Sequence, residues 1–240
     1  MAFNWTQLAL SEVVPHFDAH SHEGHALIAV ATLGIASTAA IGLGAIARRQ
    51  LGSGDQAVVP ASKFSVRGIF EGITEIISNL ANSVIGEHGR YYVPMFSTVF
   101  FFVLLNNLMG VIPGMTPATE NLNTSLAFGV FMFLAYNYYG MKEAGVVNYL
   151  KHFAGPVILL APLMIPIEIV SHLVRPASLG LRLSNVLMGD HKVLGMFLDM
   201  VPAIVPIPFY VMGLFVCVLQ AFVFTLLSMV YVAVATAHDH

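Results

Sequence analysis

The sequence predicts an all-α integral membrane protein with about five membrane-crossing helices, the last two long and tilted, and one amphipathic helix on the cytoplasmic surface. Hydrophobic residues make up 57% of the 240 residues and charged residues 10%, whereas a soluble domain is about a quarter charged. The apolar runs are continuous over ~20 residues, as membrane helices require, and do not alternate like barrel strands. No polar stretch is long enough for a soluble core, so residues 1–240 are expected to form one membrane domain.

The first two segments are a polar tail and a crossing. Residues 1–24 are rich in histidine and are expected to form a solvated tail outside the membrane, without a metal site. They show no basic region and no small-residue cleavage site after an apolar core, so no cleaved signal peptide is expected. Residues 25–47 are apolar and end at Arg48 and Arg49, and they are expected to form the first crossing.

The middle of the chain predicts a surface helix and a helical hairpin. Residues 64–89 place apolar residues at helical spacing opposite polar ones such as Arg67 and Glu71, which is typical of an amphipathic helix lying on a membrane. Residues 92–141 are expected to form a hairpin of two crossings joined by a polar turn at 113–123.

The end of the chain, residues 157–236, is expected to form two long helices. Residues 157–190 would be roughly 51 Å long as a helix, against a hydrocarbon core of ~30 Å, so we expect both helices to lie strongly tilted. The single cysteine, Cys217, excludes an internal disulfide and a multi-cysteine metal site.

The basic residues predict the orientation in the membrane. With five crossings, seven of them fall on one side and only Lys192 falls on the other, which by the positive-inside rule puts the N-terminus outside and the C-terminus in the cytoplasm. The seven are Arg48, Arg49, Lys63, Arg67, Arg90, Lys142 and Lys151.

A polar stripe runs along residues 157–190 and includes an arginine at membrane depth, Arg182. At 100° per residue its members share an arc roughly 140° wide, and Ser184 and His191 fall outside it. The members are Glu168, Ser171, His172, Arg175, Ser178, Arg182, Asn185 and Asp190. Packing between helices explains the two serines of the stripe equally well. A guanidinium keeps its proton and costs at least ~2.5–3.5 kcal/mol at bilayer depth, so Arg182 is expected to face water or a partner charge.

Arg182 is expected to lack a carboxylate partner in its own chain. Glu168 lies roughly 21 Å away along a helix, and no other acidic residue is expected at a matching depth, so the simplest inference is a carboxylate on another subunit. In the last helix Gln220 and Tyr231 are three turns apart and share a side. Gln220 could bond the guanidinium or line a water path, and Tyr231 could alternatively be an interfacial aromatic.

These residues lie in stretches that resemble subunit a of the F-type rotary ATP synthases, the stator part of their membrane motor. The stretch PIEIVSHLVRPASLGLRLSN is similar to the family's segment around its essential arginine, which would be Arg182. Three further stretches resemble other helices of the family, namely LQAFVFTLLSMVYVAVA, GRYYVPMFSTVFFFVLLNNLMGVIPG and TENLNTSLAFG. The resemblance covers roughly residues 64–236.

The resemblance implies a proton-translocating subunit that couples proton flow to rotation and ATP synthesis. Residues 157–236 would carry the ion path, as two aqueous half-channels that do not meet, with Arg182 between them facing a carboxylate on each passing c subunit. The cytoplasmic half-channel would be lined by Glu168, Ser171, Arg175, Ser178 and Tyr231. The outer half-channel would be lined by Asn107, Asn185, Asp190, His191 and Gln220.

The resemblance also implies partners and a location. The partners would be a ring of c subunits, the b subunits of the peripheral stalk and the rest of the ATP synthase complex, in the lipid of an energy-coupling membrane such as the bacterial plasma (inner) membrane. No cofactor, metal or nucleic acid is implied. The sequence shows no phosphate-binding glycine loop and no nucleophile elbow, so the ATP chemistry is expected in other subunits.

Two positions depart from the family's pattern. The family has an asparagine four residues after the arginine, whereas Asn185 follows Arg182 by three. Relatives often pair the position of His191 with an ionisable residue seven before the glutamine, and here that residue is Gly213. Asp190 is the candidate to supply the missing group.

Two other classes of protein remain as alternatives. A stand-alone proton-coupled secondary transporter commonly has two similar halves with broken helices, whereas here the two ends differ and the polar stripe lies in the last third of the chain. A purely structural scaffold would not require Arg182. Copurification with a ring of small acid-bearing hairpins distinguishes a stator subunit from both.

Overall fold

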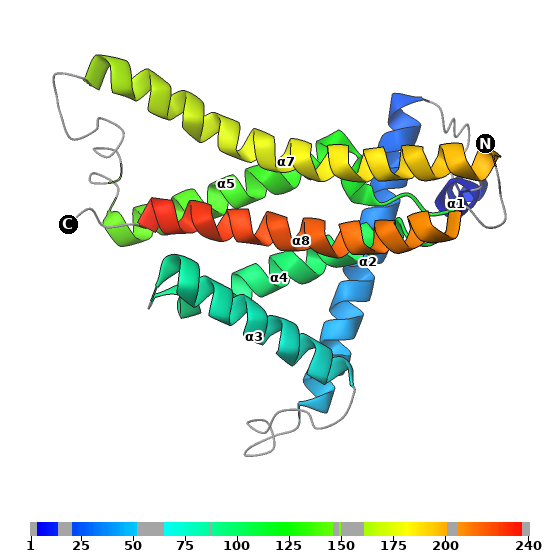
Figure 1. Ribbon diagram of the computed structural model, residues 1–240, viewed down its shortest axis with the longest axis horizontal. Coiled ribbons are helices and arrows are strands. Elements are labelled where there is room, and N and C mark those ends of the chain that lie inside the picture. Colours follow the sequence, from blue (N-terminus) through cyan, green and yellow to red (C-terminus); the bar gives the residue numbers. More distant parts are fainter. Residues whose placement is uncertain are drawn as a thin grey trace.

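The computed structural model describes residues 4–13, 21–51, 65–86, 88–145, 149, 161–200 and 206–236. Every regular element within these ranges is a helix, which confirms the all-α class (Figure 1). The helices are α1 (Trp5–Val13), α2 (His22–Gln50), α3 (Val66–Ile85), α4 (Gly89–Met109), the 3-10 helix η2 (Ala118–Glu120), α5 (Leu122–Ala144), α7 (Ala161–Met200) and α8 (Pro206–Thr236).

The first helix, α1, lies within the segment that the sequence predicts as a solvated tail. Asn4 caps it, because the Asn4 Oδ1 atom accepts hydrogen bonds from the amides of Thr6 (3.0 Å) and Gln7 (3.2 Å). The Trp5 amide donates to the carbonyl oxygen of Gly114 at 2.8 Å, so α1 is tied to the turn that follows α4. This part of the tail therefore packs on the membrane domain.

Helix α7 is longer than the predicted run of 157–190, since it continues to Met200. Asp190 and His191 therefore lie inside the helix and not at its end. Pro166 and Pro176 also lie within it, and each removes a backbone hydrogen bond from the helical ladder. Figure 1 shows that α7 bends along its course.

Short-range signals in the sequence set several helix ends. Ser21 and Ser65 each cap the next helix, because their hydroxyls accept a hydrogen bond from the amide three residues on (2.9 and 3.1 Å). Gly86 ends α3 and Gly145 ends α5, with φ of 88° and 77°, a backbone conformation that glycine adopts without steric cost.

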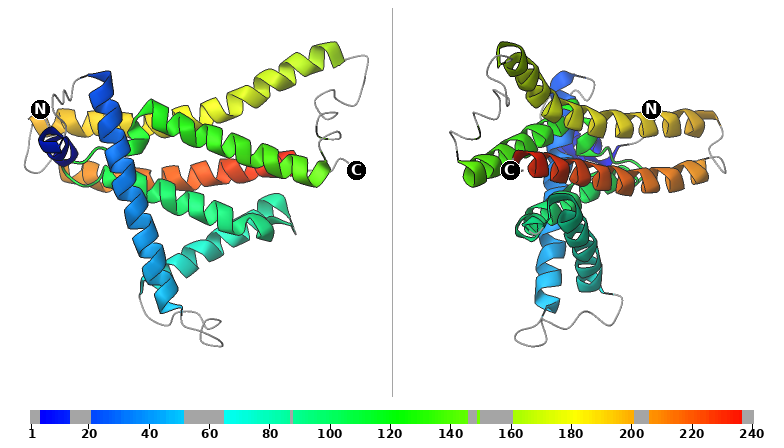
Figure 2. Two further views of the ribbon diagram at one scale, coloured as in Figure 1. Left: turned by 180° about the vertical axis from the view of Figure 1, so that it is seen from behind. Right: turned by 60° about the vertical axis from the view of Figure 1, so that its left-hand side comes forward.

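The helices form a tilted bundle with one steep crossing. Helices α4, α5, α7 and α8 run roughly alongside one another, and α2 crosses them steeply (Figures 1 and 2). A bilayer that α2 crosses upright therefore leaves α7 and α8 strongly tilted. Such a tilt accommodates the 40 residues of α7, because an upright helix of that length would be about twice as long as the ~30 Å hydrocarbon core.

Three helices within the described ranges, α2, α4 and α8, are long and apolar enough to cross a membrane by length and composition. Helices α5 and α7 are also long, with 23 and 40 residues. They carry polar side chains that contact one another across the bundle, as described below.

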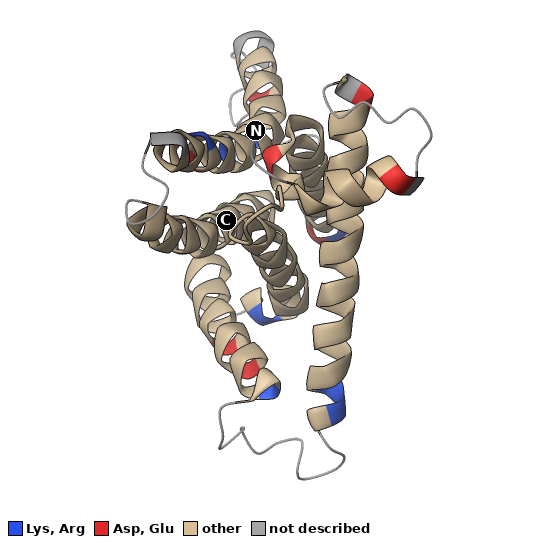
Figure 3. Cartoon of the chain, turned by 90° about the vertical axis from the view of Figure 1, so that its right-hand side faces the viewer, with Lys and Arg blue, Asp and Glu red and all other residues tan. Residues whose placement is uncertain are grey.

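Basic residues gather at one end of α2 (Figure 3). Arg48 and Arg49 lie in its last turn. Arg67, near the start of α3, donates hydrogen bonds to two carbonyl oxygens at the end of α2 (3.3 Å each). Two further members of the predicted basic set, Lys63 and Lys151, lie outside the described residues.

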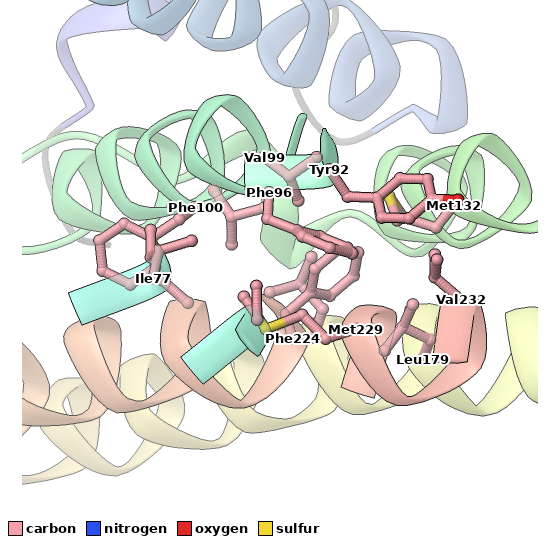
Figure 4. Packing of buried hydrophobic residues seen from close by; sticks show 14 of the residues in the cluster. Ile77, Tyr92, Phe96, Val99, Phe100, Met132, Leu179, Phe224, Met229 and Val232 are labelled. Atoms are coloured by element: carbon pink, nitrogen blue, oxygen red, sulfur yellow. The ribbon is translucent and has the colours of Figure 1, made fainter. Parts of the chain in front are cut away.

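A single cluster of buried apolar side chains joins α3, α4, α5, α7 and α8 (Figure 4). Its members include Ile77, Tyr92, Phe96, Val99, Phe100, Met132, Leu179, Phe224, Met229 and Val232. The close packing of these side chains holds α7 and α8 against the hairpin of α4 and α5.

Two glycines let α5 and α7 approach closely. A Cβ atom at Gly129 of α5 would lie 2.3 Å from the carbonyl oxygen of Pro176. A Cβ atom at Gly180 of α7 would lie 2.8 Å from the Cα atom of Leu126. Small residues commonly permit such close helix contacts in membranes, and here the contact brings the polar residues of α7 against α5.

Candidate functional site on helix α7

The polar residues of α7 do not all face one way. Ser171, Arg182 and Asn185 are exposed, whereas His172 and Ser184 are buried against other helices. The predicted stripe is therefore divided between an outward face around Arg182 and inward contacts at the two ends of the helix.

Arg182 points away from its own chain. Its side chain is exposed, and within the described ranges it forms no hydrogen bond and no ion pair. Its neighbours Leu181 and Val186 are exposed apolar residues. A guanidinium on an apolar membrane face is unfavourable unless water or an opposite charge meets it.

The first inward cluster, called here the Glu168 cluster, joins α7 to α8 through Glu168, Arg175 and Tyr231. Arg175 Nη2 lies 3.8 Å from Glu168 Oε1, and the Arg175 guanidinium lies 5.9 Å from the centre of the Tyr231 ring. The structure thus brings together three of the residues predicted for the cytoplasmic half-channel. Ser178 donates a hydrogen bond to the Arg175 carbonyl within α7 (3.0 Å), and Ser171 is exposed.

Further polar groups lie beside the Glu168 cluster that sequence reasoning missed. Asn137 of α5 places its Oδ1 atom 2.8 Å from His172 Nε2 and accepts a hydrogen bond from the Tyr149 hydroxyl at 2.8 Å. Burial raises the pKa of Tyr149, which keeps its phenol protonated as a donor. Tyr136 is only 1% exposed, and its hydroxyl is buried without a partner among the described residues. An amide inside an apolar crossing, such as Asn137, was the signal available in the sequence.

The second inward cluster, called here the Glu120 cluster, joins α7 to the turn between α4 and α5. His191 Nδ1 lies 2.8 Å from Glu120 Oε2, and His191 Nε2 lies 3.1 Å from the Gly110 carbonyl oxygen. Both ring nitrogens face acceptors, so the ring satisfies both contacts only when both nitrogens carry a proton. Ser184 donates a hydrogen bond to the Glu120 carbonyl at 2.7 Å. The sequence places Glu120 in a polar turn and gives no sign that it meets α7.

Asp190 lies directly against Gly213 of α8. A Cβ atom at Gly213 would be 2.7 Å from Asp190 Oδ2, so a larger side chain there would displace the carboxylate. The two residues are therefore neighbours, as the expectation that Asp190 replaces a missing ionisable group at Gly213 requires.

Asn107 and Gln220 are both buried between α4 and α8. The Asn107 side chain accepts a hydrogen bond from the Thr119 hydroxyl (2.9 Å) and donates to the Cys217 carbonyl (3.4 Å), so its polar atoms bond within the protein. Gln220 is 4% exposed, and its amide nitrogen has no partner among the described residues. No hydrogen bond joins Gln220 to Arg182 in the structure, so the predicted bond to the guanidinium is not formed within this chain.

The two clusters lie at opposite ends of the hairpin formed by α4 and α5. Asn137 is near the end of α5, whereas Gly110 and Glu120 flank the turn at the other end. Arg182 lies between the clusters along α7. Each cluster is polar and joins several helices, but within the described ranges no hydrogen bond or ion pair links one cluster to the other.

No group of three or more His, Cys, Asp or Glu side chains within the described part of the chain could hold a metal ion. Two histidines of the predicted tail, His16 and His20, lie outside that part. The described site is built from amides, hydroxyls, carboxylates, imidazoles and the guanidinium groups of Arg175 and Arg182. Carboxylates and imidazoles bind and release protons, whereas the guanidinium groups keep theirs.

Comparison with known proteins identifies the family. The family model described as "ATP synthase A chain" matches residues 28–233. The chain is 68% identical over 240 residues to ATP synthase subunit a of Bdellovibrio bacteriovorus, which covers 100% of both proteins. It is 40% identical over 200 residues to ATP synthase subunit a 2 of Syntrophotalea carbinolica, covering 83% of this chain and 82% of that protein. It is 45% identical over 164 residues to ATP synthase subunit a of Geobacter sulfurreducens, covering 68% and 71%. These matches confirm the resemblance found in the sequence, and the chain belongs to the ATP synthase A chain family.

Proposed function

We propose that Arg182 separates two aqueous half-channels in this chain and faces a carboxylate on each passing subunit of a c-ring. As a member of its family, the chain is a proton-translocating membrane subunit of the ATP synthase complex. The observation that carries the residue assignment is the exposed Arg182, which has no partner within the described ranges of its own chain.

The electrostatic attraction between Arg182 and a ring carboxylate would be strong enough to favour deprotonation and weak enough to be reversible. At 4 Å and an effective dielectric constant of 20, two unit charges attract by about 4 kcal/mol before desolvation is subtracted. This attraction favours loss of the proton from an arriving carboxylate. It is also weak enough for the ring to move on once the carboxylate is protonated again.

The Glu168 cluster supports the cytoplasmic half-channel. Glu168, Arg175 and Tyr231 lie together, with Ser178 one turn from Arg175 and Ser171 exposed on the same helix. By the positive-inside rule this end of α7 is cytoplasmic, which places the N-terminus outside and the C-terminus inside. A partly exposed acidic and basic pair of this kind keeps water and protons near the mouth of a path.

The outer half-channel is proposed at the other end of α7. Its walls are Asn107, Asn185, Asp190, His191 and Gln220. The unpartnered amide nitrogen of Gln220 supports water there, because buried donors are generally satisfied by protein or by water. Beside Gln220, Asn107 holds α4 against α8 through its hydrogen bond to the Cys217 carbonyl.

The proposed partners follow from the exposed faces. A ring of c subunits would cover the Arg182 face of α7, and the peripheral stalk b subunits would bind elsewhere on the membrane domain, in a bacterial inner membrane. A stand-alone transporter is disfavoured, because the matched relatives are ATP synthase subunits and Arg182 has no partner in the described part of its own chain.

A cysteine cross-link tests the proposed contact with the ring. Asn185→Cys places a thiol one turn from Arg182 on the exposed face, and we expect it to form a disulfide with a cysteine placed near the ring carboxylate of a c subunit. The natural Cys217 is buried and should stay unreactive. The matched control is Leu134→Cys, an exposed position on α5, which should not cross-link. Equal yields at both positions would contradict the assignment of the ring to α7.

Glu168→Gln is expected to slow proton flow without abolishing it. The carboxylate sits at the proposed cytoplasmic mouth, where a negative charge raises the local proton concentration, and water can still pass an amide. ATP-driven acidification of inverted vesicles between about pH 6 and 9 measures this effect. An unchanged rate throughout that range would remove Glu168 from the path.

A further inference from the structure

We propose that Glu120 carries the proton at the outer end of the path, and that protons reach it through a pocket beneath α1. This inference rests on the outer half-channel proposed above. It adds a residue from the turn between α4 and α5, which lies outside the two long helices.

The Glu120 cluster gives the carboxylate a fixed position. Its Oε2 atom lies 2.8 Å from His191 Nδ1, and its backbone carbonyl accepts a hydrogen bond from the Ser184 hydroxyl at 2.7 Å. His191 is in turn held by the carbonyl oxygen of Gly110 at 3.1 Å. Glu120 is thus held against α7 through its carboxylate and its backbone carbonyl, while its Oε1 atom has no hydrogen-bond partner among the described residues.

The pocket next to this pair makes it accessible to water. The cavity has a volume of about 240 Å³. Apolar side chains such as Ile112 and Leu194 form much of its wall, and its polar lining residues are Asn4, Gln7 of α1, Thr116, Tyr210, Glu120 and His191. A water molecule takes about 30 Å³ in the liquid, so several waters fit. The side chains of Glu120 and His191 are 25% and 20% exposed. A purely structural ion pair would not need a cavity large enough for water, with further polar side chains in its wall, against both members.

Asp190 directly precedes His191 in α7. It packs against Gly213 of α8, whereas Glu120 opens to the pocket. A proton can therefore pass from the pocket to the interior in two steps. A hydronium ion in the pocket loses a proton to Glu120, which becomes a neutral carboxylic acid. That acid then returns its proton to a water on the side of Asp190 and becomes a carboxylate again. His191 acts as a positioning residue that holds the carboxylate in place.

Among the described residues, few other titratable groups surround this pair, and Cys217 of α8 lies near Asp190. Asp190 and Lys192 belong to α7, and Tyr210 of α8 lines the pocket. Helix α1 contributes Asn4 and Gln7, which do not titrate. A change in the pH dependence of proton flow after substitution of Glu120 can therefore be attributed to the Glu120 cluster.

The test measures passive proton conductance of membranes whose ATP-hydrolysing subunits have been stripped, as a function of pH on the outer side. Glu120→Gln keeps an oxygen acceptor for His191 but cannot carry a proton, so we expect a loss of conductance of about tenfold, below the ~10²–10⁴-fold range for acid–base groups because water and Asp190 remain. The dependence on outer pH should flatten. The matched control is Glu23→Gln, an exposed carboxylate in the first turn of α2, which should leave both unchanged.

A second measurement covers the case in which Glu120→Gln does not assemble. Gln7→Cys places a thiol in the pocket of an otherwise unchanged complex, and a bulky thiol reagent added from the outer side should then lower the conductance. Wild-type conductance and pH dependence in Glu120→Gln, or full conductance after labelling of Gln7→Cys, would overturn the proposal. The function itself is judged separately by ATP synthesis in Arg182→Ala, because that variant should lose coupled synthesis whatever carries the proton at the outer end.

Discussion

Arg182→Ala is expected to abolish ATP synthesis driven by a proton gradient while the complex stays assembled. The side chain is exposed and has no partner in the described part of its own chain, so its removal leaves no buried group unsatisfied. A guanidinium at bilayer depth costs the isolated subunit at least ~2.5–3.5 kcal/mol, and its loss should not unfold α7. What disappears is the positive charge that favours deprotonation of the passing carboxylate and keeps the two half-channels apart.

Arg182→Lys tests whether a positive charge alone is enough, because lysine keeps the charge but lacks the planar guanidinium. We expect it to fail as well, because a buried ammonium can lose its proton and lacks the planar fork of a guanidinium. ATP synthesis in membrane vesicles, with a blot that confirms normal levels of the subunit, measures both variants. Wild-type rates in Arg182→Ala would refute the whole mechanism. Loss of ATP synthesis supports the mechanism only if the blot and the copurifying c-ring show that the complex is intact.

The sequence predicts the long helices well because hydrophobicity and length determine them. The runs at 25–47, 64–89 and 92–141 correspond to α2, α3 and the hairpin of α4 and α5. The sequence does not reveal helix α1, because it is short and is held by an Asn4 cap and a tertiary hydrogen bond to the turn at Gly114. The end of α7 was placed ten residues early because the polar pair at 190 and 191 resembles a membrane boundary.

The candidate site was predictable where it lies along one helix and unpredictable where it depends on contacts between helices. Glu168 and Arg175 are seven residues apart, so helical periodicity alone places them on one side. Glu120 and Asn137 come from other elements, and only tertiary packing brings them to His191 and His172. Side chains that meet across a bundle leave no periodic trace in one sequence.

Among substitutions outside the polar site, Gly129→Ala is expected to lower the stability of the protein most. A Cβ atom there would lie 2.3 Å from the Pro176 carbonyl oxygen, and a backbone atom in a helix cannot move aside as a side chain can. Gly129→Ala should therefore push α7 away from α5. Overpacking of this kind typically costs ~1–3 kcal/mol, which exceeds the ~0.5–1 kcal/mol that alanine gains over glycine inside a helix.

Gly44→Ala is the matched control for Gly129→Ala. Gly44 lies within α2, and a Cβ atom there would meet nothing within 4 Å, so alanine should be neutral or slightly stabilising. The measurement is the temperature at which the purified complex loses proton pumping, together with the amount of subunit retained in it. Gly129→Ala should lower both, and displacement of α7 should also break the contact between His172 and Asn137 across the same interface. Equal stability of Gly129→Ala and Gly44→Ala would show that α5 and α7 do not pack as closely as described. The placement of the Glu168 cluster against α5 would then also be wrong.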